Sequence, residues 1–321
     1  MKAQIDPSIV SRAQGCLLGQ LAGDALGSMV EFRTVEEIRR EYPQGLRELA
    51  DGGTWGTIAG QPTDDSEMAL ALARMLCARA TYDAAEARKA YVFWLESGPF
   101  DCGSTVYSGL RGRPNAKSQA NGAMMRISPL GIFGVNYDLQ QVAGWAQQDA
   151  ALTHPHPVCL QANALFAMAI TRAIATGAGS EDLFRQIQIW AREMNAERSL
   201  VESITAAATA PPNDYAAQQG WVLIAFRNAL WQMLHAANLE DAVSDTVMRG
   251  GDTDTNAAIV GALLGAVHSR DAVPARWAKT LLNCRPAAVE PHVRHPRPEC
   301  FWPVDVLELA AQLVAMGNNF G

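Results

Sequence analysis

Two short acidic stretches stand out because each places carboxylates and hydroxyls at the start of an apolar helix. The first, TDDSE at residues 63–67, directly precedes the apolar segment MALALARML. A Thr or Asp at a helix N-cap, with acids in the first turn, is ordinary helix chemistry. By itself, this stretch is therefore explained by helix capping and requires no function.

The second acidic stretch, GGDTDT at residues 250–255, precedes AAIVGALLGA. This helix is apolar almost all round, which predicts that it is buried and that its two aspartates lie near the interior. Buried carboxylates without a partner are energetically costly, so they require a cation or a proton. The two glycines allow the backbone to turn sharply into the helix.

Taken together, the two stretches predict a metal site. If the two helices pack side by side, four carboxylates and at least two hydroxyls converge on an all-oxygen ligand set, which suits Mg²⁺ or Mn²⁺ rather than zinc. Four carboxylates exceed what one ion needs. A site with two ions, which lie about 3.5–4 Å apart in such centres and bind substrate oxygens, is therefore favoured.

A glycine stripe marks the helix expected over residues 10–28. It places four glycines on one face, at Gly15, Gly19, Gly23 and Gly27. Each glycine costs about 1 kcal/mol in a helix interior, and close approach of a neighbouring helix explains the stripe. The segment GALLGA at 261–266 echoes GCLLGQ at 15–20, as close helix packing would select. Glu31 follows the stripe in the sequence, which predicts that its carboxylate lies at the end of this helix.

The remaining sequence predicts an all-α fold. Apolar residues recur at spacings of three and four over residues 10–28, 66–80, 84–96, 139–153, 159–176, 180–195, 216–237, 239–247, 255–268 and 302–316. The best strand candidate, 125–135, is weakened by Pro129 and two glycines. Residues 44–62, with five glycines, predict a loop. Residues 286–303, with five prolines, predict an extended surface belt that carries His292, Arg294, His295 and Arg297.

The composition is that of a globular protein. The 321 residues are 49% apolar and 18% charged, which excludes a disordered or fibrous chain. We expect a single domain over 1–321, with a motif-bearing core at about 10–270 and the belt and a last helix at 286–321. The net charge is −7 and no basic block of five occurs, so nucleic-acid and membrane partners are disfavoured.

Several features predict a cytoplasmic location. The N-terminus lacks the apolar core of a signal peptide. The run of apolar residues and glycines at 257–267 is about half of the ~20 residues that a membrane span needs. The six cysteines are scattered without a CxxC pair, which is typical of reduced, buried thiols rather than of disulfides or a zinc site.

Five motifs in order carry a family resemblance over most of the chain, from about residue 15 to residue 268. They are GxLLGxxxGDALGSxxE at 15–31, TDDS at 63–66, SQANGAMMR at 118–126, LTH at 152–154 and GGDTDTNAAIxGALLGA at 250–266. The chain resembles the ADP-ribosylglycohydrolase family, which includes the dinitrogenase reductase-activating glycohydrolases and the ADP-ribosylarginine and ADP-ribosylserine hydrolases. The two acidic motifs are its most specific part.

The resemblance implies a single all-α orthogonal helical bundle with a binuclear Mg²⁺ or Mn²⁺ centre in a cleft. Glu31 matches a mobile acid that can reach the metals or a water. Ser66 stands where many members have a second threonine, so a hydroxyl is retained. The implied metal ligands are Thr63, Asp64, Asp65, Asp252, Asp254 and Thr255.

Further positions match substrate-binding groups of the family. Asp101 matches an acid near the scissile ribose, although a helix cap explains it equally well. His154 matches a position near the ribose or a phosphate, and Trp221 matches an adenine-stacking tyrosine, with core packing equally plausible. Residues 118–122 match a polar loop of the family that is able to offer backbone N–H groups to a diphosphate. In this loop Ala120 replaces a glycine found in some branches. The residues of the loop expected to bind the substrate are Ser118, Gln119, Asn121 and Gly122.

The resemblance implies a metal-dependent hydrolase that cleaves the glycosidic bond between ADP-ribose and a protein side chain, with arginine as the first expectation. A water would attack C1″ with Glu31 as its base, and Asp101 or another acid would assist the leaving group. Which of Glu31, Asp65 and Asp101 acts as the base and which as the acid stays open at this point. The expected partner is an ADP-ribosylated protein or a small-molecule ADP-ribose conjugate.

Other functions remain open from the sequence. The same chemistry could act on serine-linked, O-acyl or small-guanidine ADP-ribose. The chain could instead be an immunity or regulatory protein that reverses or masks an ADP-ribosyltransferase, a non-catalytic binder, or a phosphohydrolase that uses the same metals. Retention of every expected acid argues against a non-catalytic binder.

Overall fold

The computed structural model describes residues 5–316, and this part of the chain is built from helices and loops without a strand. The fifteen α-helices are α1 (Pro7–Gly27), α2 (Val35–Glu41), α3 (Asp64–Arg79), α4 (Ala84–Glu96), α5 (Ser104–Leu110), α6 (Ser128–Phe133), α7 (Leu139–Ala151), α8 (Pro157–Thr176), α9 (Ser180–Glu193), α10 (Arg198–Ala206), α11 (Val222–His235), α12 (Leu239–Val247), α13 (Thr253–His268), α14 (Ala275–Asn283) and α15 (Val306–Met316). The predicted all-α class is confirmed.

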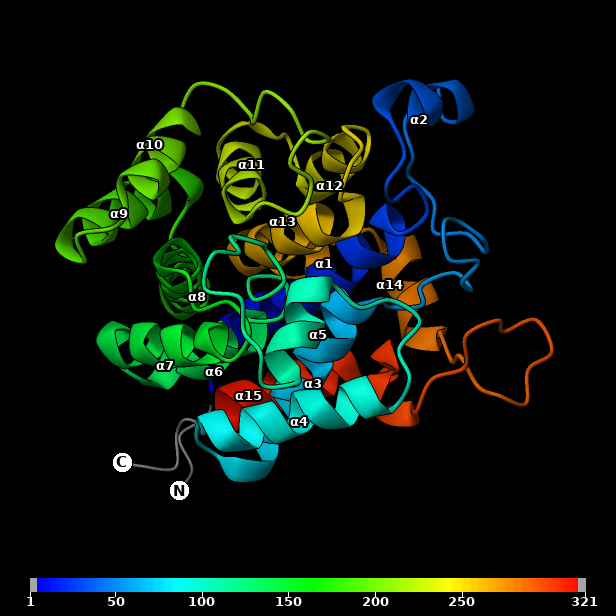
Figure 1. Ribbon diagram of the computed structural model, residues 1–321, viewed down its shortest axis with the longest axis horizontal. Helices are drawn as coiled ribbons and strands as arrows, with labels where there is room; N and C mark the ends of the chain where they lie inside the picture. The colour runs from blue at the N-terminus through cyan, green and yellow to red at the C-terminus, as the bar shows by residue number, and fades with distance from the viewer. Residues whose placement is uncertain (1–4, 317–321) are drawn as a thin grey trace.

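The centre of the bundle is the antiparallel pair α1 and α13 (Figure 1). A Cβ atom built on Gly19 would lie 2.2 Å from the carbonyl oxygen of Gly261, and one on Gly23 would lie 2.0 Å from that of Ala257. The two backbones are therefore in direct contact, as the glycine stripe predicted. One turn further, Gly27 meets the backbone of Asp254, so the end of α1 lies against the first turn of α13.

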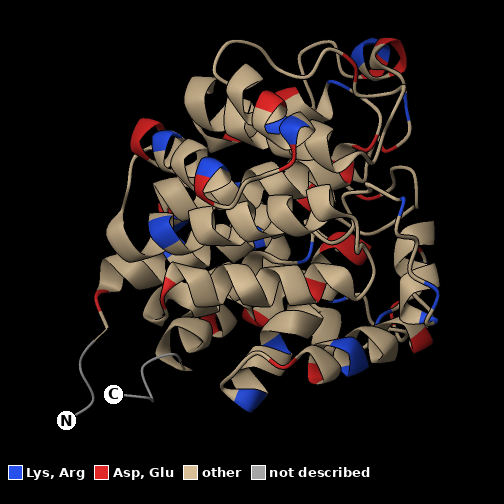
Figure 2. Ribbon diagram, turned by 60° about the vertical axis from the view of Figure 1, so that its left-hand side comes forward, with Lys and Arg blue, Asp and Glu red and all other residues tan. Residues whose placement is uncertain are grey.

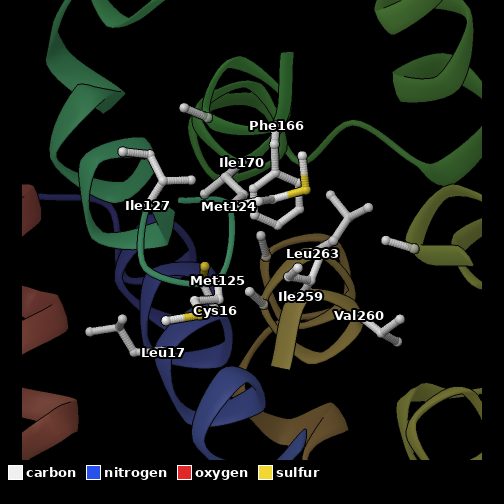
Figure 3. Packing of buried hydrophobic residues seen from close by; sticks show 14 of the residues in the cluster. Cys16, Leu17, Met124, Met125, Ile127, Phe166, Ile170, Ile259, Val260 and Leu263 are labelled. Carbon is white, nitrogen blue, oxygen red and sulfur yellow. The ribbon is translucent and has the colours of Figure 1, made fainter. Parts of the chain in front are cut away.

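The other long helices enclose this pair. Helices α8, α11 and α12 pack against α13, and α15 packs against α1. Figure 3 shows side chains from α1, α8, α13 and the segment around Met124 and Met125 pointing into one apolar cluster. Helix α8 is long and apolar enough to cross a membrane, but 78% of its apolar window is buried inside the bundle, as in the core helices of globular proteins.

Most predicted helices are present, with shifted ends. The segment 125–135 is no strand: Pro129 occupies the first turn of α6, where its missing N–H is harmless. The helix expected from residue 216 begins only at Val222, because Gly220 adopts φ +78° and the chain before it forms turns. Helices α2, α5, α10 and α14 have seven to nine residues and were not predicted.

The C-terminal belt contains one wrong prediction. Arg297 is buried rather than on the surface: its Nε and Nη2 each donate to a carboxylate oxygen of Glu67 at 2.8 Å. The indole N–H of Trp94 donates to the same carboxylate, also at 2.8 Å. Because Glu67 lies in the first turn of α3, this ion pair attaches the belt to the helix that carries Asp64 and Asp65.

All six cysteines are free thiols, three of them buried and three partly buried. Lys and Arg are dispersed over the outer helices and loops and are mixed with Asp and Glu, whereas long stretches of the central helices carry neither (Figure 2).

We expect Gly19→Ala to lower the free energy of unfolding by about 3 kcal/mol or more, because overpacking against a backbone forces α1 and α13 apart. Gly144 in α7 is the matched control, since a Cβ there meets nothing within 4 Å. Gly144→Ala should raise stability by about 0.5–1 kcal/mol. Urea unfolding of both variants tests this; equal effects at the two positions would contradict the packing argument.

Candidate functional site

The two acidic stretches meet in one cleft of about 310 Å³. Its lining comes from the end of α1, the starts of α3 and α13, the segments 101–106 and 120–125, and the loop 219–220. Of the residues singled out from the sequence, it includes Glu31, Asp64, Asp65, Asp101, Asn121, Gly122, His154, Asp252, Asp254 and Thr255. The two helices that carry the acids do not pack along their lengths, however. Helix α13 packs lengthwise on α1 and makes little contact with α3, and the starts of α3 and α13 both line the cleft.

The first turn of α3 is held by Asp24, a fully buried acid in α1. Its carboxylate accepts hydrogen bonds from the backbone N–H groups of Thr63, at 3.2 Å, and Ser66, at 3.1 Å. The Thr63 hydroxyl lies 2.9 Å from Asp24 Oδ1 and 3.1 Å from Asp65 Oδ2. Sequence reasoning missed this residue, although an acid in the largely apolar, glycine-striped second half of the helix was a usable signal.

The second acidic stretch is fixed by the turn before α13. Gly251 has φ +76°, and a Cβ there would lie 2.2 Å from the carbonyl oxygen of Tyr215, so glycine is required. The Thr253 hydroxyl donates to the carbonyl oxygen of Gly27 at 2.7 Å, which ties the helix start to the end of α1. The amide of Asn121 donates to Asp252 Oδ2, also at 2.7 Å.

Glu31 is positioned by Trp55, which sequence reasoning also missed. The indole N–H donates to Glu31 Oε2 at 2.6 Å. Gly53, with φ +71°, lets this loop approach α1, because a Cβ there would lie 2.5 Å from the Cα of Met29. The carbonyl oxygen of Trp55 lies 2.8 Å from His295 Nε2, and the His295 ring stacks on Phe100 next to Asp101.

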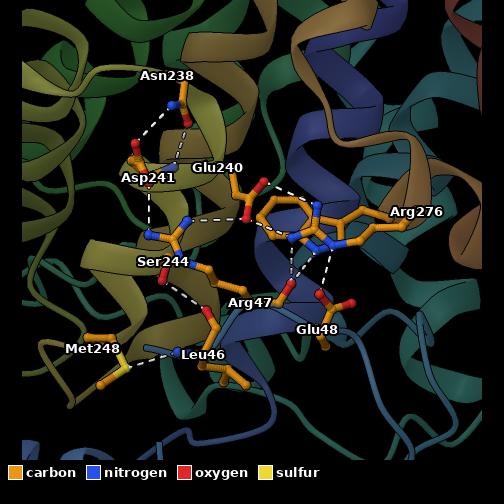
Figure 4. A network of polar contacts seen from close by, with 10 residues as sticks. Leu46, Arg47, Glu48, Asn238, Glu240, Asp241, Ser244, Met248 and Arg276 are labelled. Atoms are coloured by element: carbon orange, nitrogen blue, oxygen red, sulfur yellow. Dashed lines mark hydrogen bonds and ion pairs between the residues drawn. The ribbon is translucent and has the colours of Figure 1, made fainter. Parts of the chain in front are cut away.

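The loop that carries Trp55 is anchored at its start by a polar network between α12 and α14 (Figure 4). Arg47 pairs with Asp241 at 2.8 Å, and Arg276 pairs with Glu48 at 2.8 Å and with Glu240 at 2.6 Å. Exposed ion pairs contribute little individually. Here they link residues 46–48 to two helices and so define the path of the loop toward Glu31.

The cleft is strongly acidic. No Lys or Arg lines it within the part of the chain that the structure describes. One carboxylate oxygen from each of Glu31, Asp101 and Asp254 lies within 4.8 Å of the other two. Burial, followed by repulsion from Asp101 and Asp252, raises the pKa of Glu31 to about 8.

Burial is also the largest cause of the raised pKa values of Asp64, Asp65 and Asp254, which lie well above their usual range because of added repulsion from neighbouring carboxylates. The pKa of Asp101 is raised, again chiefly by burial. Asp65 Oδ1 and Asp254 Oδ2 are buried and have no hydrogen-bond partner. Unpaired, hard oxygen donors in an enclosed site fit a divalent cation such as Mg²⁺ or Mn²⁺.

His154 offers a neutral polar group to the cleft. Its Nδ1 lies 2.7 Å from the Thr153 hydroxyl, while Nε2 is buried without a partner. Burial, with a smaller effect from Arg126, lowers the pKa of His154 to about 3, so the ring is neutral at physiological pH. Gly122 permits this placement, because a Cβ there would lie 3.2 Å from His154 Cε1.

Four of the expected site residues do not line the cleft itself. Thr63 lies behind Asp65, as described above. Ser118 lies 2.9 Å from the Thr105 hydroxyl, through their side-chain oxygens. Gln119 accepts a hydrogen bond from the indole N–H of Trp221 at 3.0 Å. Trp221 lines a neighbouring cavity of about 560 Å³. The role of Thr63 as a metal ligand and the roles of Ser118, Gln119 and Trp221 in substrate binding stay predictions.

Comparison with known proteins shows relatives along most of the chain. The chain is 33% identical to the ADP-ribosyl-(dinitrogen reductase) glycohydrolase of Rhodospirillum rubrum, over 86% of this chain and 92% of that protein. It is 26% identical to the ADP-ribosylarginine hydrolase Tri1 of Pseudomonas putida (strain GB-1), over 84% of this chain and 74% of that protein.

A solved structure described as an ADP-ribosylglycohydrolase-related protein complex shares the fold, with a TM-score of 0.80 and 24% identity. The similarity covers 97% of this chain and 99% of that chain. The sequence profile of the family described as ADP-ribosylglycohydrolase matches residues 6–316. The chain belongs to the ADP-ribosylglycohydrolase family, whose members hydrolyse ADP-ribose linkages to proteins.

Proposed function

We propose that this protein is a Mg²⁺-dependent hydrolase that releases ADP-ribose from arginine side chains of proteins. The observation that carries the proposal is the buried cluster of carboxylates with unpaired oxygens and no lining Lys or Arg among the described residues. Arginine as the modified residue is supported by the relative named as an ADP-ribosylarginine hydrolase.

Two divalent ions would be held by the hydroxyls of Thr63 and Thr255 and the carboxylates of Asp64, Asp65, Asp252 and Asp254. When bound, Mg²⁺ or Mn²⁺ would neutralise this cluster and supply Lewis acidity toward the ribose hydroxyls. The unpaired oxygens of Asp65 and Asp254 are the observation that supports this assignment. Asp24 is a positioning residue, because its oxygens are occupied by Thr63 and Ser66.

The protein's own groups account for substrate orientation and proton transfer. His154, whose Nε2 has no partner, and the loop at Asn121 and Gly122 line the cleft, and they would orient the ribose and diphosphate. The hydrogen bond from Trp55 holds Glu31 at the cleft. With divalent cations bound, the pKa of Glu31 would fall from its raised value, so that the carboxylate could take a proton from the attacking water. Asp101 retains its proton more readily than an ordinary aspartate and suits protonation of the leaving guanidine nitrogen.

We further propose that the protein acts in the cytoplasm and as one domain over residues 1–321. The six free thiols suit a reducing compartment. The apolar cluster joins residues from α1 through α15, which supports a single core. Its partner would be an ADP-ribosylated protein or a small-molecule ADP-ribose conjugate.

The substrate proposal predicts release of ADP-ribose from an arginine-linked conjugate with Mg²⁺ and no release after EDTA treatment. The measurement is chromatographic quantification of ADP-ribose from arginine-linked and serine-linked peptides of the same sequence. Metal-dependent release from serine alone would retain the metal centre and overturn the arginine assignment. Undiminished release in EDTA would overturn the metal centre.

The metal proposal predicts opposite effects of Asp254→Asn on stability with and without Mg²⁺. Since burial raises the folded-state pKa of Asp254 above its unfolded value, the ionised form opposes folding, and stability falls as pH rises through the folded-state pKa. In EDTA at pH 7.5, the variant should be more stable than the wild type by about 1 kcal/mol or more.

With Mg²⁺ at about a hundredfold excess over Kd, the wild type should gain about 2–3 kcal/mol, and the Asn variant should gain much less. Thermal unfolding monitored by circular dichroism measures both effects. Asp271→Asn is the control, because this side chain is 79% exposed and lies away from the cleft. An equal Mg²⁺ response in wild type and Asp254→Asn would contradict Asp254 as a ligand.

A further inference from the structure

Phe32, which directly follows Glu31, combines two unfavourable features. Its side chain is 54% exposed although it is a large apolar group, and its backbone has φ +63°. The left-handed conformation costs roughly 1–2 kcal/mol for a residue with a Cβ, and a bulky residue there is an outlier. A glycine would remove both costs, so packing within the fold does not explain the phenylalanine.

The backbone conformation of Phe32 is fixed by its neighbours. Its N–H donates to the carbonyl oxygen of Gly251 at 2.8 Å, and the N–H of Gly251 donates to the carbonyl oxygen of Arg33 at 3.2 Å. These bonds join the end of α1 to the turn before Asp252. They hold Phe32 in the lining of the cleft, next in sequence to Glu31, while about half of the residue stays open to solvent.

The surroundings of the ring define what it can bind. Phe32 lines the same cleft as Glu31, Asp101 and Asp254, whose carboxylates would handle proton transfer at the leaving group. The electron-rich face of an aromatic ring attracts cations, and guanidinium groups stack on it especially well. A half-open aromatic ring at the rim of an acidic cleft therefore suits a planar cation that enters from solvent.

We propose that Phe32 is a specificity-determining residue that stacks on the guanidinium of the modified arginine. This inference rests on the proposed hydrolysis of arginine-linked ADP-ribose and adds the group that recognises the acceptor side chain. A serine-linked substrate presents no cation at this position and gains nothing from the ring face. The nucleobase of ADP-ribose, the competing occupant, is distinguished by the test below.

The expected effect has the size of an exposed cation–π contact, which corresponds to about two- to fivefold in binding. The guanidinium is cationic in the bound substrate, and protonation of the leaving nitrogen by Asp101 as the C1″–N bond breaks would keep it cationic in the transition state. The contact then contributes to uniform binding. Its loss should therefore raise KM and leave kcat unchanged.

The test uses Phe32→Leu. Leucine keeps an apolar side chain and, like phenylalanine, is strained at positive φ, but it lacks the aromatic face. We expect KM for an arginine-linked peptide to rise about two- to fivefold with unchanged kcat. The inhibition constant of a serine-linked peptide and the Kd of free ADP-ribose, measured calorimetrically, should stay at wild-type values. Phe93→Ala is the control, since Phe93 is 57% exposed on α4 outside the cleft.

A second variant separates a functional role from a structural one. Phe32→Gly should raise Tm by about 1–3 °C, because glycine accepts the positive φ without strain, and should still raise KM for the arginine-linked peptide. A fall in Tm would show that the ring is structural and would overturn the inference.

Two further outcomes of the kinetic test would also overturn it. Wild-type KM in Phe32→Leu would exclude the guanidinium contact, and a parallel loss of affinity for free ADP-ribose would assign the ring to the nucleobase. Failure of the proposed function is visible separately, because the wild type would then release no ADP-ribose from arginine, and the inference would fall with it.

Discussion

The antiparallel contact between α1 and α13 leaves no space for side chains between the two backbones over successive turns. This contact fixes the lengthwise register of the helices, because Gly19 faces Gly261 and Gly27 faces Asp254. The same register places Glu31, at the end of one helix, beside Asp252 and Asp254, at the start of the other. The geometry of the acidic cleft is thus a consequence of helix packing that extends from Asp254 along both helices.

The buried acids fall into two groups that differ in their hydrogen bonding. Asp24 and Glu67 are satisfied within the protein, the first by Thr63 and Ser66 and the second by Arg297 and Trp94. Asp65 and Asp254 keep oxygens without partners. The satisfied acids hold α3 in place, and the unsatisfied ones retain the capacity to bind a cation. All four carboxylates are buried, so the two groups differ only in whether the protein supplies hydrogen-bond partners for every carboxylate oxygen.

The sequence predicted the features that depend on local pattern. Helical periodicity indicated the all-α class, the glycine spacing indicated a close helix contact, and the two acidic stretches indicated a shared site. Residues whose role depends on distant partners were missed: Asp24 acts on Thr63, and Trp55 acts on Glu31. Arg297 was misassigned to the surface because its partner Glu67 lies 230 residues away. Five helices of six to nine residues, α2, α5, α6, α10 and α14, escaped because they contain too few turns to show a clear period, although α12, with nine residues, was predicted.

The pairing of α1 with α13 also has a consequence for biosynthesis. Four glycines lower the intrinsic helix propensity of α1, so its stability as a helix depends on tertiary packing. Its partner is separated from it by 226 residues, as measured between Thr253 and Gly27. During translation, α13 must emerge from the ribosome before the first helix meets the surface that completes it. The nascent protein therefore exposes the apolar face of α1 that packs on α13 until α13 has been synthesised, which makes chaperone protection important for this segment.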